Sequence, residues 1–326
     1  MPKAKSAVQR VTSIFTAAII LAGCTTQVGR IGVDDGRDSC RTQLIQLDST
    51  GNFFGEDILQ GAAIGAVGGA LIGGLATGRW QGALIGAAVG GAGGAAVGYY
   101  AAVQRQARDQ AGVSAQVASD LAKENASLDR TQIAFDQLMD CRLRGAQAVR
   151  EQVRRGQLDR NTATAQLAET RQRVTGDLQL ANLIGGRIAS RGTQFDAAID
   201  QVVPGGKGAV QMAGSPPPVR VPVRRAVTMT FSPQPNSAPI ASIQQRDLVS
   251  VRPGPAGFAR VETSTGVRGY VPADAVQAPR AAVQLPSEGG DVRSLAATNI
   301  SRRENFTASV GSAERLAQAG GFELAS

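Results

Sequence analysis

The chain has 326 residues, with 34 Lys and Arg against 26 Asp and Glu, and a formal net charge of +8. It contains no histidine, which removes the usual general base, every Ser–His or Cys–His nucleophile pair and the most common metal ligand. Aromatic residues make up 4% of the chain and do not alternate with basic residues as in nucleic-acid-binding proteins. We therefore expect no catalytic residue, no metal site, no cofactor and no nucleic-acid partner.

Residues 1–23 have the order of a signal peptide. Lys3, Lys5 and Arg10 form a positive start, and an apolar run follows from 11 to 21. This run is too short to span a bilayer stably, which favours a cleaved export signal over a membrane helix.

The end of this run resembles the lipobox of bacterial lipoproteins. The residues that carry the resemblance are Leu21, Ala22, Gly23 and Cys24. In that family a peptidase cleaves before the cysteine, whose thiol carries diacylglycerol, so the resemblance implies lipid attachment at Cys24 and durable anchoring. Thr25 stands where an Asp would imply retention in the inner membrane, and its presence favours the outer membrane. The alternative is an ordinary signal peptide with an incidental cysteine.

Two further cysteines flank the next segment. Cys40 lies in the leader that follows the lipobox, residues 24–57, and Cys141 lies beyond residue 102. An even pair in an exported protein predicts a disulfide, and a loop of about 100 residues would stabilise the fold by up to ~4.7 kcal/mol. The alternatives are two unpaired thiols or a bridge to a second subunit.

Eleven glycines between positions 61 and 98 recur every four residues, with one change of phase. They are Gly61, Gly65, Gly69, Gly73, Gly74, Gly78, Gly82, Gly86, Gly90, Gly94 and Gly98. Small residues at this spacing form a helix face that a second backbone can approach closely. In water each glycine costs about 1 kcal/mol relative to alanine, whereas in lipid the backbone has no other partner than itself.

Residues 58–102 are therefore predicted to form a transmembrane helical hairpin. The two spans, 58–76 and 82–102, carry no charge, and each covers about 30 Å as a helix. Aromatic residues would mark the two membrane interfaces: Phe53, Phe54, Tyr99 and Tyr100 at one, and Trp80 at the other. The alternative is a buried Ala/Gly hairpin inside a soluble oligomer. The segment resembles the glycine-zipper two-transmembrane lipoproteins of Gram-negative outer membranes.

Residues 103–202 have the pattern of a helical hairpin or coiled-coil stalk. Apolar residues recur at three- and four-residue spacing, with charged residues between them. They are Val117, Leu121, Leu128, Phe135, Leu138 and Met139 in the first helix, and Leu167, Val174, Leu178 and Ile184 in the second. Arg155-Gly156-Gln157 breaks the pattern, and Asp159 or Asn161 can cap the second helix.

A Gly- and Pro-rich linker, residues 203–218, precedes a region in which the period changes to two. The predicted strands are 227–230, 240–243, 248–251, 258–262 and 267–271. Strands this short, separated by Pro, Asn, Gly and Ser, predict a small β-barrel within residues 219–280.

This region resembles the bacterial SH3 (SH3b) domain. The resemblance rests on four stretches: Pro235–Ile240, Arg246–Val251, Gly257–Val261 and Gly266–Val271. The most characteristic residues are Gly269, Tyr270 and Val271 in the last stretch, and Phe258 where the family usually has Trp. Members of the family often bind cell-wall peptide or sugar, and some mediate protein contacts only.

The last segment, residues 281–326, has a weak amphipathic stretch from Val292 to Leu316. We expect this tail to be mostly disordered, with one transient helix.

The predicted fold class is α+β and multi-domain, in this order: signal peptide, transmembrane glycine-zipper hairpin, helical stalk, SH3-like barrel and disordered tail. The predicted function is non-enzymatic. We expect an outer-membrane lipoprotein whose soluble parts lie in the periplasm and whose barrel contacts peptidoglycan or a periplasmic protein. The alternatives are a subunit of an oligomeric conduit or secretion system, with glycine faces packed between copies, and residence in the inner membrane. An enzyme is the third and least expected alternative.

Overall fold

The computed structural model describes residues 30–54, 99–286 and 289–324. Its helices are α3 (Arg41–Asn52), α6 (Gln110–Arg154), α7 (Arg160–Val202), α8 (Lys207–Gly214), α9 (Arg280–Val283) and α10 (Val292–Gln318), and residues 99–106 are also helical. Its strands are β1 (Val219–Pro222), β2 (Val227–Thr230), β3 (Pro239–Ile243), β4 (Leu248–Pro253), β5 (Phe258–Glu262) and β6 (Arg268–Pro272), followed by a 3-10 turn (Ala273–Ala275).

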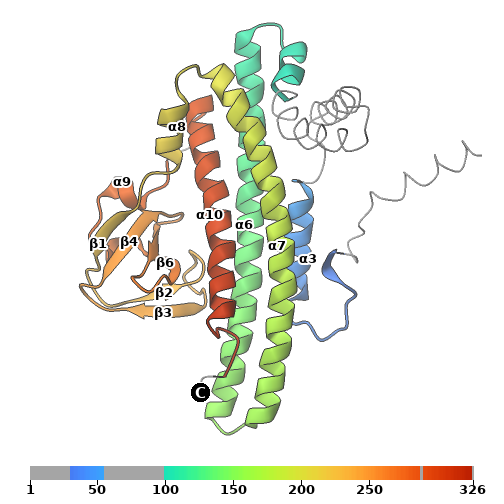
Figure 1. The fold of residues 1–326 in the computed structure, drawn as a ribbon, viewed down its shortest axis with the longest axis vertical. Coiled ribbons are helices and arrows are strands. Elements are labelled where there is room, and N and C mark those ends of the chain that lie inside the picture. The colour runs from blue at the N-terminus through green and yellow to red at the C-terminus, as the bar shows by residue number, and fades with distance from the viewer. Residues whose placement is uncertain (1–29, 55–98, 287–288, 325–326) are drawn as a thin grey trace, which may run out of the picture.

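Two long antiparallel helices, α6 and α7, form the axis of the molecule (Figure 1). They have 45 and 43 residues, and the turn between them falls at the break in the apolar pattern. Each begins with an aspartate cap: Asp109 accepts a hydrogen bond from the amide of Gly112, and Asp159 accepts one from the amide of Thr162. Gly156 allows the turn because its φ of +68° suits glycine.

The C-terminal segment is an ordered third helix, so the expectation of a disordered tail is wrong. Helix α10 packs along both α6 and α7 and buries Phe306 and Val310 between them (Figure 1). A two-helix hairpin leaves part of its apolar stripe open to water, and the weak stripe of α10 gains its stability by covering it. The amphipathic pattern predicted where α10 lies in the sequence, but only the tertiary contacts explain why α10 is stable.

The expected fold class is also corrected at the membrane hairpin. Within the described ranges, no helix combines the length and the hydrophobicity needed to cross a lipid bilayer. Residues 58–98 of the predicted hairpin lie outside the described residues. Its described end, residues 99–102, packs on the helical bundle, where Tyr99 is only 3% exposed and joins a buried cluster with Val117 and Phe195.

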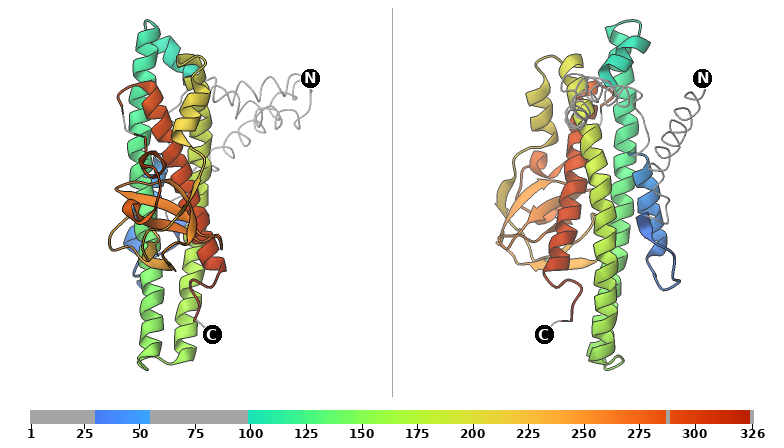
Figure 2. Two further views of the ribbon diagram at one scale, coloured as in Figure 1. Left: turned by 90° about the vertical axis from the view of Figure 1, so that its left-hand side faces the viewer. Right: turned by 45° about the vertical axis from the view of Figure 1, so that its right-hand side comes forward.

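Helix α3 packs against α6 and α7 on the side of the bundle away from the sheet (Figures 1 and 2). Gly51 makes this close approach possible, because a Cβ at that position would lie 2.4 Å from a methyl carbon of Ile184 on α7. Leu44 and Leu47 of α3 are buried in the same apolar cluster as Ile184 and Leu138.

The six strands form one antiparallel sheet in the order β1-β4-β5-β6-β2-β3. All six strands contribute to one small core, which includes Val221, Met229, Ile243, Val251, Val261 and Val271. The five predicted strands are present within one or two residues, and β1 is an additional strand that pairs with β4. The segment expected to be a linker contains α8, whose Gly214 lies against α10.

Candidate functional site

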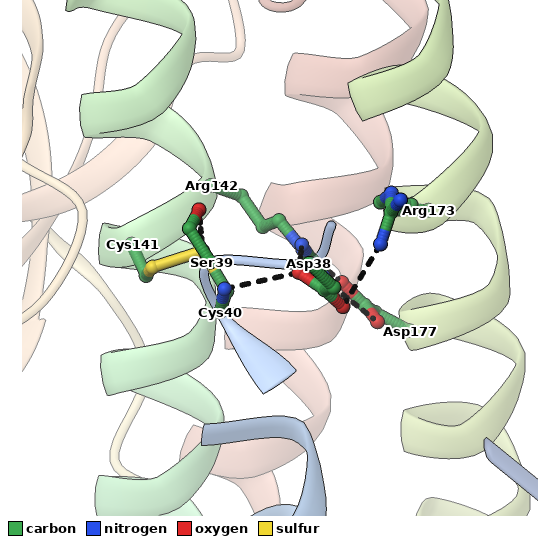
Figure 3. The surroundings of a disulfide bond; sticks show 7 residues. All are labelled: Asp38, Ser39, Cys40, Cys141, Arg142, Arg173 and Asp177. Atoms are coloured by element: carbon green, nitrogen blue, oxygen red, sulfur yellow. Dashed lines mark hydrogen bonds and ion pairs between the residues drawn. A yellow bond between two sulfur atoms is a disulfide. The ribbon is translucent and has the colours of Figure 1, made fainter. Parts of the chain in front are cut away.

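The leader is joined to the bundle by a disulfide. Cys40, the residue that precedes α3, is bonded to Cys141 of α6, with 5.9 Å between the two Cα atoms (Figure 3). The pairing chosen from the sequence is thus the one in the structure. It brings a residue only sixteen positions after Cys24 into a covalent link with the longest helix.

A buried ion network lies beside this disulfide (Figure 3). Arg142 donates to both oxygens of Asp38, and its Nε lies 2.7 Å from an oxygen of Asp177 on α7. The side chains of all three residues are at most 6% exposed. One guanidinium therefore holds the leader, α6 and α7 together, and removing one partner of such a pair leaves a buried charge without compensation.

The two carboxyl groups of this network differ in their titration. Burial would raise the pKa of Asp38, but the hydrogen bonds and charge of Arg142 outweigh it, helped by the amide of Cys40, and the pKa lies below its ordinary value. Burial raises the pKa of Asp177, and Arg142 offsets this only in part. Asp177 is the more deeply buried of the two, whereas Asp38 has more donors, and Arg173 also approaches Asp38, with 3.5 Å between nitrogen and oxygen.

The rest of the leader is held by arginine contacts. Arg30 pairs with the buried Asp48 at 2.7 Å. Arg41 donates to the carbonyl oxygens of Ile31 and Gly32, both at 2.6 Å. The first described residues of the leader are therefore folded back onto α3.

The far end of α3 is fixed by aromatic and ionic contacts. The guanidinium carbon of Arg191 lies 4.8 Å from the ring centre of Phe53 and 5.7 Å from that of Phe54. The same guanidinium donates to the buried Glu124 of α6, with Nε 3.1 and 3.0 Å from its two oxygens. A buried guanidinium that is both paired and stacked on aromatic rings fixes the end of the helix strongly.

The chain returns to the bundle at Tyr99. Its ring packs 5.3 Å from that of Phe195, and its hydroxyl donates to Asp120 at 3.0 Å. These two partners of Tyr99 lie next to the Arg191–Glu124 ion pair along the helices. Asp120 comes four residues before Glu124 on α6, and Phe195 comes four residues after Arg191 on α7. Four residues of helix span about 6 Å. Phe54 and Tyr99, the last and first described residues around the glycine-rich segment, thus contact positions one helical turn apart on α6 and α7.

We call this arrangement the zipper base. It consists of Phe53, Phe54, Tyr99, Asp120, Glu124, Arg191 and Phe195. The four aromatic residues that were expected at a membrane interface therefore include two, Phe54 and Tyr99, that are buried against protein, at 4% and 3% exposure. The eleven glycines and the lipobox residues Leu21 to Cys24 lie outside the described residues.

The four most characteristic residues of the SH3b resemblance lie in the sheet, but they do not form a free binding face. Val271 is in the core, and Phe258 and Gly269 occupy β5 and β6. Tyr270 is 2% exposed and donates its hydroxyl to Asn305 of α10 at 2.6 Å. Burial, with Asp136 nearby, raises the pKa of this tyrosine to about 12. Helix α10 therefore covers one of the most characteristic residues of the SH3b resemblance.

The charged residues of the zipper base and of the ion network were missed at the sequence level, although a signal exists. Glu124 falls between Leu121 and Leu128 at helical spacing, and Arg191 falls between Ile188 and Phe195. A charged residue at an apolar-stripe position is expected to be buried and paired. Arg142 and Asp177 follow the same rule.

Comparison with known proteins gives one match. Residues 60–105 match the model of the Gly-zipper_Omp family, described as a glycine zipper. This segment is a small part of the chain, and the match points to an outer-membrane-associated protein. No curated protein and no solved structure matches the chain.

Proposed function

We propose that this protein is a non-enzymatic lipoprotein of the outer membrane that links the membrane to the cell wall or to a periplasmic partner. Cys24 carries the lipid, and the SH3b-like barrel makes the distal contact. The observation that carries the proposal is the arrangement of the two attachments. The described leader and α3 lie on one side of the α6–α7 bundle, and the sheet lies on the other (Figures 1 and 2).

The connection between the two sides consists of buried contacts. On the membrane side, the disulfide and Arg142 join the leader to α6 and α7. On the other side, the buried carboxylate of Asp140 on α6 accepts hydrogen bonds from Ser232, Ser237 and the amide of Ala238, at 2.7 to 3.0 Å. A force applied at the lipid would therefore reach the barrel through covalent and charge-assisted contacts.

The glycine-zipper match supports the outer membrane as the location, and the zipper base holds both ends of that segment. We place the soluble parts in the periplasm because the lipobox resemblance implies export and because the cysteines pair.

The first experiment is metabolic palmitate labelling and membrane fractionation of a tagged strain. Wild type is expected to incorporate label and to sediment with outer-membrane fractions. Cys24→Ser is expected to lose both. Wild type without label, or Cys24→Ser with unchanged label, would contradict the anchor, and recovery in the inner-membrane fraction would contradict the location.

The second experiment tests the distal contact. The mature chain carrying Cys24→Ser is incubated with purified sacculi, and co-sedimentation is compared with that of an unrelated periplasmic protein of equal charge. Retention above this control supports wall binding, and its absence leaves a periplasmic protein as the partner to be sought by crosslinking. The mass of the detergent-solubilised wild type distinguishes the tether from an oligomeric conduit. The mass of a discrete ring favours the conduit, and that of a monomer or dimer favours the tether.

A further inference from the structure

A cavity of about 770 Å³ lies between the sheet and the helical bundle. Strands β4, β5 and β6 line one side, and helices α7 and α10 line the other. We call it the interface cavity. The sheet that lines it lies on the opposite side of the bundle from α3 (Figure 1), and no residue of the leader or of α3 is among its lining residues.

The interface cavity is rich in arginine. Four guanidinium groups line it, those of Arg252, Arg260, Arg268 and Arg303, against the three carboxylates of Asp196, Glu262 and Glu304. Two of the arginines are neutralised. Arg303 pairs with Asp196 at 2.7 Å, and Arg268 lies 2.8 Å from Glu262.

The other two arginines, Arg252 and Arg260, form no ion pair within the described part of the chain. Their recorded hydrogen bonds go to neutral acceptors: Arg252 donates to the carbonyl of Pro216 at 2.9 Å, and Arg260 donates to the side-chain oxygen of Asn305 at 3.2 Å. Glu304 lies in the same cavity without forming an ion pair to either arginine. Two positive charges here therefore lack a carboxylate partner.

These two arginines also face each other directly. Arg252 on β4 is the cross-strand partner of Arg260 on β5, and Arg260 is in turn the partner of Tyr270 on β6. Like charges directly opposite on neighbouring strands are destabilising. Burial lowers the pKa of Arg260, the charges of Arg252 and Arg268 act in the same direction, and Tyr270 and Glu304 act against them.

The interface cavity also contains a buried hydrogen-bond donor without an acceptor. The Nε atom of Arg303 is buried and has no hydrogen-bond partner among the described residues. Gly192 makes room for this side chain, because a Cβ there would lie 1.7 Å from one of its terminal nitrogens.

We propose that the interface cavity binds a small molecule bearing carboxylate or phosphate groups, held by Arg252 and Arg260. The guanidinium group presents paired N–H donors that match both anions, and an anionic oxygen between the two arginines would relieve their repulsion. This site is additional to the anchoring role and does not depend on it.

The test uses the mature chain with Cys24→Ser and isothermal titration calorimetry. The probes are the dipeptide γ-Glu-Ala with free carboxylates, the same dipeptide with all its carboxylates amidated, and inorganic phosphate. At least one anionic probe is expected to bind, and the amidated dipeptide is not. Preference for the dipeptide or for phosphate identifies the source of the anion.

Arg252→Gln and Arg260→Gln are each expected to weaken binding at least tenfold. Arg220→Gln is the matched control, because Arg220 lies on β1 of the same sheet, is exposed and is not among the residues that line the cavity. The melting temperature of Arg252→Gln without ligand is expected not to fall, since the variant removes a repulsive pair. A structural role for Arg252 would lower it.

Failure of both anions to bind, or equal affinity for wild type and both cavity variants, would overturn the proposal. If Arg260→Gln does not fold, the affinity of Arg252→Gln for the anionic probes decides whether the cavity is the binding site. Palmitate labelling and fractionation report on anchoring separately, so a negative titration leaves the proposed function standing.

Discussion

Asp136 is a buried carboxyl group that faces the sheet from α6. The amide nitrogen of Gln132 donates to it at 2.8 Å, and no ion pair reaches it in the described part of the structure. Burial raises its pKa well above the ordinary value, and the neighbouring Asp140 adds to the effect. A raised pKa in the folded state means that Asp136 weakens the fold increasingly as the pH rises above its unfolded value, about 3.9.

We therefore expect Asp136→Asn to raise the melting temperature by a few degrees at pH 8 and to change it little at pH 4. Circular dichroism melts at pH 4, 6 and 8 measure this. Asp274→Asn is the control, because Asp274 is exposed and its surface pair with Arg225 contributes little. A variant that is less stable than wild type at pH 8 would show that Asp136 is held charged by contacts that outweigh its burial.

At this scale the sequence predicted apolar positions better than charged ones. Leu121, Leu128 and Ile184 lie in the core as the stripe indicated. Glu124 and Arg191 occupy the same stripe, but each needs a partner on the other helix, and the register between two helices is not readable from either one alone. The disulfide could be predicted because only two cysteines remained once Cys24 was assigned to the lipid.

At the scale of elements, the connection between β2 and β3 is held to α6 by Asp140, which accepts hydrogen bonds from Ser232, Ser237 and the amide of Ala238. Asp140→Ala leaves buried donors without an acceptor, so we expect a loss of about 3 kcal/mol in stability. We also expect faster proteolysis in residues 215–218, the connection to the sheet. Limited proteolysis and thermal melts measure both.

Glu151→Ala on the same helix is the control for this prediction. Glu151 pairs with Arg154 and Arg155 at the surface, and exposed pairs of this kind contribute about 1 kcal/mol or less. Equal proteolysis rates for the two variants would mean that Asp140 does not hold the barrel in place.

The disulfide leads to a second prediction at this scale, which concerns how much it contributes to holding helix α3 in place. The double variant Cys40→Ser and Cys141→Ser removes the constraint on a loop with a sequence separation of 101, for which chain entropy gives up to ~4.7 kcal/mol. Dithiothreitol is expected to lower the melting temperature of wild type towards that of the variant and to leave the variant unchanged. A wild type insensitive to reductant would argue that α3 is held by its noncovalent contacts.

The ordered C-terminal helix shows why elements were only partly predictable. The amphipathic stretch from Val292 to Leu316 coincides with α10, yet its own pattern is too weak to indicate stability. Its stability comes from contacts such as Phe306 with Phe135, whose ring centres lie 5.7 Å apart. Helix α8 was missed for a related reason, since its glycines indicate a linker until α10 is present to pack against.

At the scale of the whole molecule, the zipper base predicts that the glycine-rich segment can be removed without loss of the remaining fold. Phe54 and Tyr99 contact positions about one helical turn apart on α6 and α7, and a loop of about eight residues reaches up to ~27 Å. A chain with residues 55–98 replaced by such a Gly/Ser loop is expected to keep its helical circular dichroism and its melting temperature within about 3 °C.

The control for this replacement is the same chain with Arg191→Gln, which removes the ion pair with Glu124 and the contact with both phenylalanine rings. It is expected to melt at a clearly lower temperature. A replacement chain that does not fold would show that residues 55–98 contribute to the core of the described structure.

The overall order of helices and strands could be predicted, whereas the way they assemble could not. The change from helical to strand periodicity separated the helical bundle from the sheet correctly, because it depends on local spacing alone. The docking of the sheet on α10 depends on contacts such as Tyr270 with Asn305, 35 residues apart in sequence. The predicted membrane hairpin relied on composition, and its described end at Tyr99 proved to be part of the bundle.

The bond between Cys40 and Cys141 also makes the glycine-rich segment part of a closed covalent ring. A protease that cuts once within residues 55–98 would therefore not separate the residues before Cys40 from the rest of the chain. The cut protein would still migrate as one species on a non-reducing gel and would part into two fragments only after reduction. A chain built in this way stays in one covalent piece after a single break in its most glycine-rich region.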